Sequence, residues 1–188
     1  SGGSLSGSYF PRAYDCIAEG LNIPPVKILN GGEIDEVLKE VIFDNIRTPA
    51  ACWADLMLIY GSMNRAAKDI CTLIDKYGLD TVKACNSEMI RRDEDAMREQ
   101  ISEIEDGEYY GEMGVDWDGS TPGRHLYVRV KLTVTGDEMT FDFTGSDEQV
   151  DFINSPLGNT HAYVFMALFL TMDPSIPHNH GAIEPIHI

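Results

Sequence analysis

The sequence predicts an α+β protein in which a long antiparallel helical hairpin precedes a small antiparallel sheet and a buried C-terminal helix. Between positions 33 and 106, apolar residues recur at intervals of three and four, which is the period of an amphipathic helix. After Gly107 they alternate with polar residues, which is the period of a strand. We expect a single piece of a larger subunit, with a loop at 1–32, a helical part at 33–106 and the sheet, apolar helix and proline-rich tail at 107–188.

The composition is that of a folded globular protein with a strong negative charge. Of the 188 residues, 43% are hydrophobic and 24% are charged, and the formal net charge is -17. This charge repels nucleic-acid phosphates and anionic lipid headgroups, so we expect neither nucleic acid nor a membrane as a partner. The cysteines form no CxxC pair, and the first residues lack the regions of a signal peptide, which together favour a cytoplasmic location.

The first 32 residues are rich in glycine, serine and proline, which predicts an extended or turning backbone. Gly2, Gly3 and Ser4 offer permissive backbone and exposed N–H groups, which suit the close approach of an anion or ligand. A plain loop is the alternative interpretation. The segment is not a nucleotide-binding P-loop, because the GK[ST] ending is missing. Because the chain opens in mid-loop, we expect it to belong to a longer polypeptide.

Two helices are predicted before position 78. The first begins at Glu33 and has an apolar face that includes Val37 and Val41. Thr48 and Pro49 have the residue types of an N-cap and a first helical residue. The second helix therefore starts there and ends at Gly78, in the position where glycine commonly follows a helix.

A third helix is predicted from Asp80 or Thr81 to about position 106. The connection to the second helix is so short that the two must run antiparallel, with Trp53 in the seam between them. The charged run RRDED at 91–95 lies inside the third helix and is interpreted as a solvated face, with Arg91 and Asp95 at a helical neighbour spacing.

The predicted sheet is built around a hairpin. Alternating segments at 126–134 and 139–144 are separated by Gly136-Asp137, a two-residue loop with glycine first, as a type II′ turn requires. Residues 108–117 add a third strand. An almost wholly apolar helix then runs from about position 159 to 172, and a helix without charged residues is expected to be buried, in this chain or against a part of the protein that lies outside it.

The C-terminal histidines are candidate metal ligands. His178 and His180 form an HxH pair, which can chelate a metal from an extended strand, and a metal-binding regulator would use them. A loop of exposed histidines between two prolines is the alternative. His161, beside the apolar helix, is interpreted as a structural histidine.

Eight segments, taken in order, resemble one family. They are GGSLSGSYFP (2–11), EGLNIPPVKI (19–28), NIRTPAACWADL (45–56), YGLDTV (77–82), DGEYYGE (106–112), MTFDFTGSDEQV (139–150), INSPLGNT (153–160) and DPSIPHNHGAIEPI (173–186). The chain thereby resembles the hydantoinase B/oxoprolinase family. This family includes N-methylhydantoinase B subunits, the matching half of 5-oxoprolinase and acetone carboxylase alpha subunits.

The resemblance implies an internal fragment of the B-type subunit of an ATP-dependent cyclic-amide hydrolase, or of the related ketone carboxylase. The family's metal ligands lie before the glycine-rich segment, so the resemblance implies no metal site and no nucleotide site in this chain. ATP and a divalent metal are expected in the complete enzyme. An A-type ATP-binding subunit is the expected partner in a hetero-oligomer, and the isolated chain should be inactive.

Asp142, Asn154, Asn179 and Gly181 stand at positions that the family pattern also specifies, whereas the two neighbouring histidines fall at variable positions. A carboxylate at a strand end is a base, a ligand or a turn cap, and an amide that both donates and accepts suits a substrate or a neighbouring loop. No catalytic residue is assigned. A stand-alone helical interaction module without catalysis is the alternative function. The predicted substrate-binding residues are Gly2, Gly3, Ser4, Asp142, Asn154 and Asn179.

Overall fold

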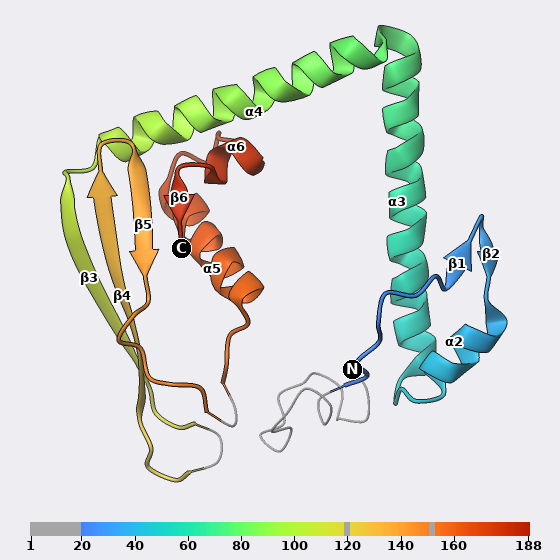
Figure 1. Cartoon of the computed structure of the whole chain (residues 1–188), viewed down its shortest axis with the longest axis horizontal. Helices are drawn as coiled ribbons and strands as arrows, with labels where there is room; N and C mark the ends of the chain where they lie inside the picture. Colours follow the sequence, from blue (N-terminus) through green and yellow to red (C-terminus); the bar gives the residue numbers. More distant parts are fainter. Residues whose placement is uncertain (1–19, 119–120, 151–152) are drawn as a thin grey trace. The chain divides into compact units, whose positions relative to one another are not determined.

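The structure is a computed structural model that describes residues 20–118, 121–150 and 153–188 (Figure 1). The chain divides into two compact units, residues 1–72 and 73–188. The long helices precede a mostly antiparallel sheet in the sequence, which confirms the predicted α+β class.

The first unit contains a short hairpin that the sequence did not predict. Strands β1 (Leu29–Asn30) and β2 (Glu33–Ile34) pair antiparallel across two glycines with positive φ. This hairpin takes up the residues at which the first helix was predicted to start. Helix α2 (Glu36–Phe43) begins later, where the Asp35 carboxylate caps it by accepting a hydrogen bond from the backbone N–H of Leu38 at 2.9 Å.

The contact between α2 and helix α3 (Pro49–Tyr77) organises this unit. Phe43 is buried and meets the Trp53 ring edge-on, with 5.3 Å between the ring centroids. The ammonium group of Lys39 lies 4.8 Å from the centroid of the same indole. Trp53 therefore packs on α2, and its predicted place between the two long helices stays a prediction. Val37, predicted on the buried face of the first helix, is 73% exposed.

Helix α3 ends where the sequence predicts. Gly78 has a φ of 85°, and its N–H donates to the Ile74 carbonyl at 2.8 Å. The carbonyl of Gly78 accepts from the N–H of Val82, so α4 (Leu79–Ser102) begins at once and neither Asp80 nor Thr81 caps it. None of the residues of α3, all of which the structure describes, is buried. The predicted packing of the two long helices against each other stays a prediction.

The second unit is built on a four-stranded sheet in the order β3-β4-β5-β6. Strands β3 (Gly107–Val115), β4 (Leu126–Thr135) and β5 (Glu138–Asp142) are antiparallel. The hairpin prediction is confirmed, because Thr135 pairs with Glu138 and Gly136 has a φ of 60°. Strand β6 (Ile186–His187), at the end of the proline-rich tail and not predicted from the sequence, pairs parallel with β5.

One face of this sheet forms the core with α4 and α5 (Leu157–Thr171). Within this chain the apolar helix α5 is buried only at Val164 and Leu168, and Leu170 is 79% exposed. Its burial against a part outside this chain, the other option that the sequence left open, stays a prediction. The buried cluster comprises Met97, Ile101, Val134, Met139, Val164, Leu168, Ile176, Ala182 and Ile186.

The short helix α6 (His180–Ile183) packs against the side of α4 (Figure 1). A Cβ added at Gly181 would lie 1.9 Å from the Ile90 carbonyl oxygen, which is backbone and cannot swing away. Only glycine fits at this position. The family position Gly181 is therefore explained by the close approach of two helices.

We expect Gly181→Ala to destabilise the chain by about 3 kcal/mol, the upper end of the cost of overpacking, because α6 must move off α4. Gly158→Ala in α5 is the matched control, since nothing lies within 4 Å of an added Cβ there. The control should be neutral or stabilising by up to about 1 kcal/mol. Denaturant unfolding measures both, and equal small effects would contradict the close contact.

We expect Trp53→Ala to cost roughly 2–3 kcal/mol, below the value for a fully buried aromatic residue, because its indole is half-buried against α2. A double-mutant cycle with Phe43→Ala should show a coupling of about 0.5–1.5 kcal/mol from the ring pair. Leu58→Ala, at an exposed site on the same helix, should cost about 0.5 kcal/mol or less. Strictly additive losses would mean that the two rings do not pack together.

Candidate functional site

Asn179 holds the C-terminal tail against α4. Its side-chain oxygen accepts hydrogen bonds from the backbone N–H groups of Gly181 at 2.9 Å and Ala182 at 3.4 Å, which caps α6. Its amide nitrogen donates to the carboxylate of Asp93 in α4. Asp93 is half-buried, so the interpretation of the whole 91–95 run as a solvated face is wrong at this residue. The predicted Arg91–Asp95 pair is confirmed.

Asp142 ends β5 and caps the turn that follows. Its carboxylate accepts a hydrogen bond from the Thr144 N–H at 2.8 Å. The hydroxyl and the N–H of Thr144 lower the pKa of the Asp142 carboxyl below its ordinary value, so the group is ionised at neutral pH.

The loop after Asp142 is joined to β4. The hydroxyl of Ser146 accepts from the Arg129 N–H at 2.9 Å and donates to the Arg129 carbonyl at 3.0 Å. Asp147 accepts from the Tyr127 N–H at 2.7 Å. These bonds extend the sheet's hydrogen bonding beyond the end of β5, and they keep the Asp142 turn in a defined position.

Asn154 lies on the loop that leads to α5. Its side-chain oxygen accepts from the N–H of Val150 at 3.0 Å, and its amide nitrogen donates to the Val150 carbonyl. The Asn154 amide therefore acts as both acceptor and donor in closing this loop. This is the loop-binding role, one of the two roles that the sequence left open for it.

The predicted site residues do not join into one cluster by direct contact. Among the residues that the structure describes, no hydrogen bond or ion pair links any two of Asp142, Asn154 and Asn179, and each has a different backbone or side-chain partner. Gly2, Gly3 and Ser4 lie outside the described residues. The substrate-binding role of all six stays a prediction.

The histidines of the tail have separate partners. His178 stacks on Phe169 with 4.0 Å between the ring centroids, and Nε2 of His180 lies 3.2 Å from the Glu184 carboxylate. Across residues 20–118, 121–150 and 153–188, no cluster of three or more His, Cys, Asp or Glu side chains is placed to bind a metal ion. The described residues thus do not fit a metal site.

His161 sits in the first half of α5 with its ring edge-on to Phe165. Its Nε2 is buried and has no hydrogen-bond partner among the described residues. The ring packs inside the protein, as the structural interpretation has it, but the hydrogen bond expected of a structural histidine is not made at Nε2 by the described residues.

Asp118 is a buried carboxylate that sequence reasoning missed. It is 1% exposed, accepts from the N–H of Thr121 at 2.6 Å and lies 3.6 Å from the Arg124 guanidinium. An Asp-Gly pair has the composition of an ordinary surface turn, so no local signal distinguished it.

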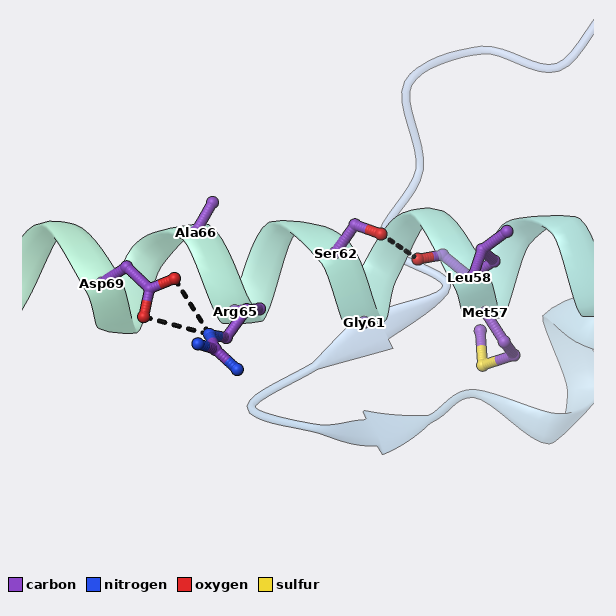
Figure 2. Close-up of a pocket in the computed structure, with 7 residues that line it drawn as sticks. All are labelled: Met57, Leu58, Gly61, Ser62, Arg65, Ala66 and Asp69. Atoms are coloured by element: carbon purple, nitrogen blue, oxygen red, sulfur yellow. Dashed lines mark hydrogen bonds and ion pairs between the residues drawn. The ribbon is translucent and has the colours of Figure 1, made fainter.

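A shallow surface depression of about 530 Å³ runs along α3 (Figure 2). Its polar groups are already paired: the Arg65 guanidinium binds the Asp69 carboxylate at 2.9 Å, and the Ser62 hydroxyl donates to the Leu58 carbonyl. A depression whose described lining comes from one helix suits contact with another surface better than catalysis. The lining residues are Met57, Leu58, Gly61, Ser62, Arg65, Ala66 and Asp69.

No helix in the described ranges combines the length and apolar character that crossing a membrane requires. Asp142, Asn154 and Asn179 lie at separate loop ends, and each is held by hydrogen bonds to its own local partners.

Comparison with known proteins shows which family this sequence and fold belong to. The sequence matches the hydantoinase B/oxoprolinase family over residues 1–188. The B subunit of a putative D-/L-hydantoinase from Pseudomonas sp. (strain NS671) is 34% identical over 190 residues, which cover 94% of this chain and 32% of the relative. The beta subunit of caprolactamase from Pseudomonas jessenii is 31% identical over 187 residues, which cover 100% of this chain and 32% of the relative. The chain thus spans about a third of the length of these curated relatives.

Solved structures agree. The crystal structure of ATP-dependent caprolactamase from Pseudomonas jessenii superposes with a TM-score of 0.89 at 30% identity, over 99% of this chain and 32% of that chain. A nucleotide-free acetone carboxylase structure superposes with a TM-score of 0.79 at 15% identity, over 90% of this chain and 24% of that chain, which shows a shared fold. The match along the full 188 residues confirms the resemblance found in the sequence: the chain belongs to the hydantoinase B/oxoprolinase family.

Proposed function

We propose that the chain is part of the B-type subunit of an ATP-dependent enzyme that hydrolyses cyclic amides of the hydantoin or 5-oxoproline type. The observation that carries the proposal is the agreement with ATP-dependent caprolactamase, at a TM-score of 0.89 and 30% identity over nearly the whole chain. Caprolactam, hydantoin and 5-oxoproline all contain an amide within a ring. Relatives named for the first two share about a third of their residues with this chain over the aligned region.

Ketone carboxylation is the second candidate. It is favoured by the fold shared with acetone carboxylase, at a TM-score of 0.79. That likeness comes with 15% identity, about half of the identity to the hydantoinase and caprolactamase subunits. The sequence relationship therefore favours the hydrolase.

In this proposal the chain binds neither ATP nor a metal itself, and both act elsewhere in the complete enzyme. The relatives are named as the B and beta subunits of their enzymes, which supports an A-type partner that carries the ATP site. The sequence has no GK[ST] phosphate-binding motif, in agreement with this division. We also place the enzyme in the cytoplasm, supported by the free thiols of Cys52, Cys71 and Cys85.

The proposed contribution of this chain is to position the ring amide. An ionised Asp142 accepts a hydrogen bond from a ring N–H, and the Asn154 amide has one donor and one acceptor left to offer. The Asn179 amide offers one remaining N–H donor, because its oxygen already accepts two hydrogen bonds. Backbone N–H groups of Gly2 and Gly3 suit an anionic, activated carbonyl. The local hydrogen bonds of the three described side chains support this role by holding each group in a fixed orientation.

The 188-residue chain alone should not turn over hydantoin or 5-oxoproline with ATP. The complete B-type subunit with its A-type partner should release a ring-opened product and phosphate together. Parallel assays contain hydantoin, 5-oxoproline, caprolactam, or acetone with bicarbonate. Consumption of acetone alone selects the second candidate, and ATP-dependent hydrolysis by the isolated chain contradicts the proposed division of labour.

Asp142→Asn in the complete enzyme should raise KM about tenfold, the equivalent of one lost charge-assisted hydrogen bond. Because the folded-state pKa of Asp142 is lowered, its hydrogen bond from Thr144 is retained above the ordinary pKa and lost as the pH falls through the lowered value. Asp116→Asn, at a fully exposed carboxylate, is the control and should leave KM unchanged. A lower melting temperature with an unchanged KM would show that Asp142 only caps its turn.

A further inference from the structure

Helix α3 carries a line of apolar side chains that repeats every 3.5 residues. The line follows a single helix that is continuous from Pro49 to Tyr77, and its members are alternately four and three positions apart. This heptad spacing, sustained over more than three heptads and without a charged member, is the pattern of a coiled-coil seam. We call the line the α3 seam; it consists of Cys52, Leu56, Ile59, Met63, Ala66, Ile70, Leu73 and Tyr77.

Most of the α3 seam is exposed. Met63 is 66% exposed, and Ile59, Ile70, Leu73 and Tyr77 also face solvent. The contacts of α3 with its own unit lie beside the start of the seam, where Trp53 meets α2, and Cys52 and Leu56 are only half-exposed there. A row of large apolar side chains left uncovered along one helix is a mark of an interaction surface.

The charges of α3 indicate which partner this surface fits. The chain as a whole has a net charge of -17 and should repel a second copy of itself. Helix α3 is an exception, because it holds three aspartates and three basic residues and is formally neutral. Two copies can therefore associate through α3 without electrostatic repulsion at the contact.

The flanking residues indicate the orientation of the partner. Heptad positions beside the seam on one side are Asp55, Ser62, Asp69 and Lys76. In an antiparallel pair these positions face their own counterparts, and the alignment that sets Ile59 opposite Ile70 also sets Asp55 opposite Lys76. The symmetry of the pair produces this contact twice.

The same alignment matches the sizes of the seam residues. It sets Met63 opposite Ala66, which pairs a large side chain with a small one, as close packing between helices requires. A parallel pair would instead bring Asp55 against Tyr60 and Asp69 against Ile74, so that neither carboxylate would meet a basic residue. Only the antiparallel alignment satisfies both the charges and the seam.

We infer that α3 pairs antiparallel with α3 of a second copy of this chain through the α3 seam. The surface is distinct from the residues proposed to bind substrate, and the pairing of two B-type chains does not depend on that proposal. Because the exposed seam packs only on association, the pair forms in a concentration-dependent equilibrium.

Sedimentation equilibrium of the 188-residue chain tests the pairing, with one substitution in the seam and one beside it. Met63→Asp should weaken the dimer at least tenfold, because it places a charge in an apolar layer. Leu58→Asp is the matched control, since Leu58 is 70% exposed on the same helix but off the seam, and it should leave the dimer intact. Circular dichroism should show equal helix content for both variants. A chain that is monomeric at every concentration, or a dimer that both variants or neither variant dissociates, would overturn the proposal.

A charge exchange tests the orientation. Asp55→Lys and Lys76→Asp should each weaken the dimer several-fold, because each sets like charges opposite one another. The double variant Asp55→Lys/Lys76→Asp restores opposite charges and should regain the original dissociation constant. Added salt should reduce the difference between the single variants and the original chain. A double variant as weak as the sum of its singles would refute the antiparallel pairing.

Discussion

The packing of Gly181 against the backbone of α4 is the contact on which the second unit depends. The two backbones approach so closely that any side chain at this position would overlap the Ile90 carbonyl. Asn179 fixes the orientation of α6 on α4, because it caps α6 and donates a hydrogen bond to Asp93 of α4 at the same time. With α6 held in place, the tail returns to the sheet, where the Met139 N–H donates to the Pro185 carbonyl at 3.0 Å and β6 pairs with β5. The last residues of the chain thereby complete a core that the helix and the hairpin alone leave open.

Charge is distributed in the second unit so that the sheet has two different faces. On the polar face, Arg129 binds Glu112 at 2.6 Å and Lys131 approaches Glu108 at 3.4 Å, both across the β3–β4 pair. Arg98 joins α4 to the turn of the hairpin through ion pairs that include Asp137. Each exposed pair contributes little to stability, but the pairs select the register in which the opposite face is apolar. Arg98, Arg129 and Lys131 are thus used for internal pairing, and the excess of acidic residues accounts for the net negative charge.

The relation to hydantoinase and oxoprolinase subunits gives the local geometry its functional meaning. Several positions that match the family pattern have a clear structural role, since Gly181 allows two helices to touch, Asn154 closes a loop and Asp142 caps a turn. A match to a family pattern therefore combines residues that the fold needs with residues that the reaction needs. The proposed substrate contacts use side chains whose orientation is already set by backbone partners, and orientation is what a cyclic amide requires of a positioning surface.

The sequence by itself determined the features that depend on neighbouring residues. The start of α3 at Pro49, its end at Gly78 and the hairpin turn at Gly136 follow from capping and from backbone angles that glycine and proline favour, so they were predicted correctly. The Asn179–Asp93 bond joins residues that are distant in the sequence. Asp118 is buried although it stands in an ordinary turn motif. The periodicity of a helix, moreover, does not say which element covers its apolar face. For this reason the partner of Trp53, the half-exposed state of α5 and the parallel strand β6 were decided only by the tertiary structure, in which contacts between distant segments choose among the faces that local sequence makes available.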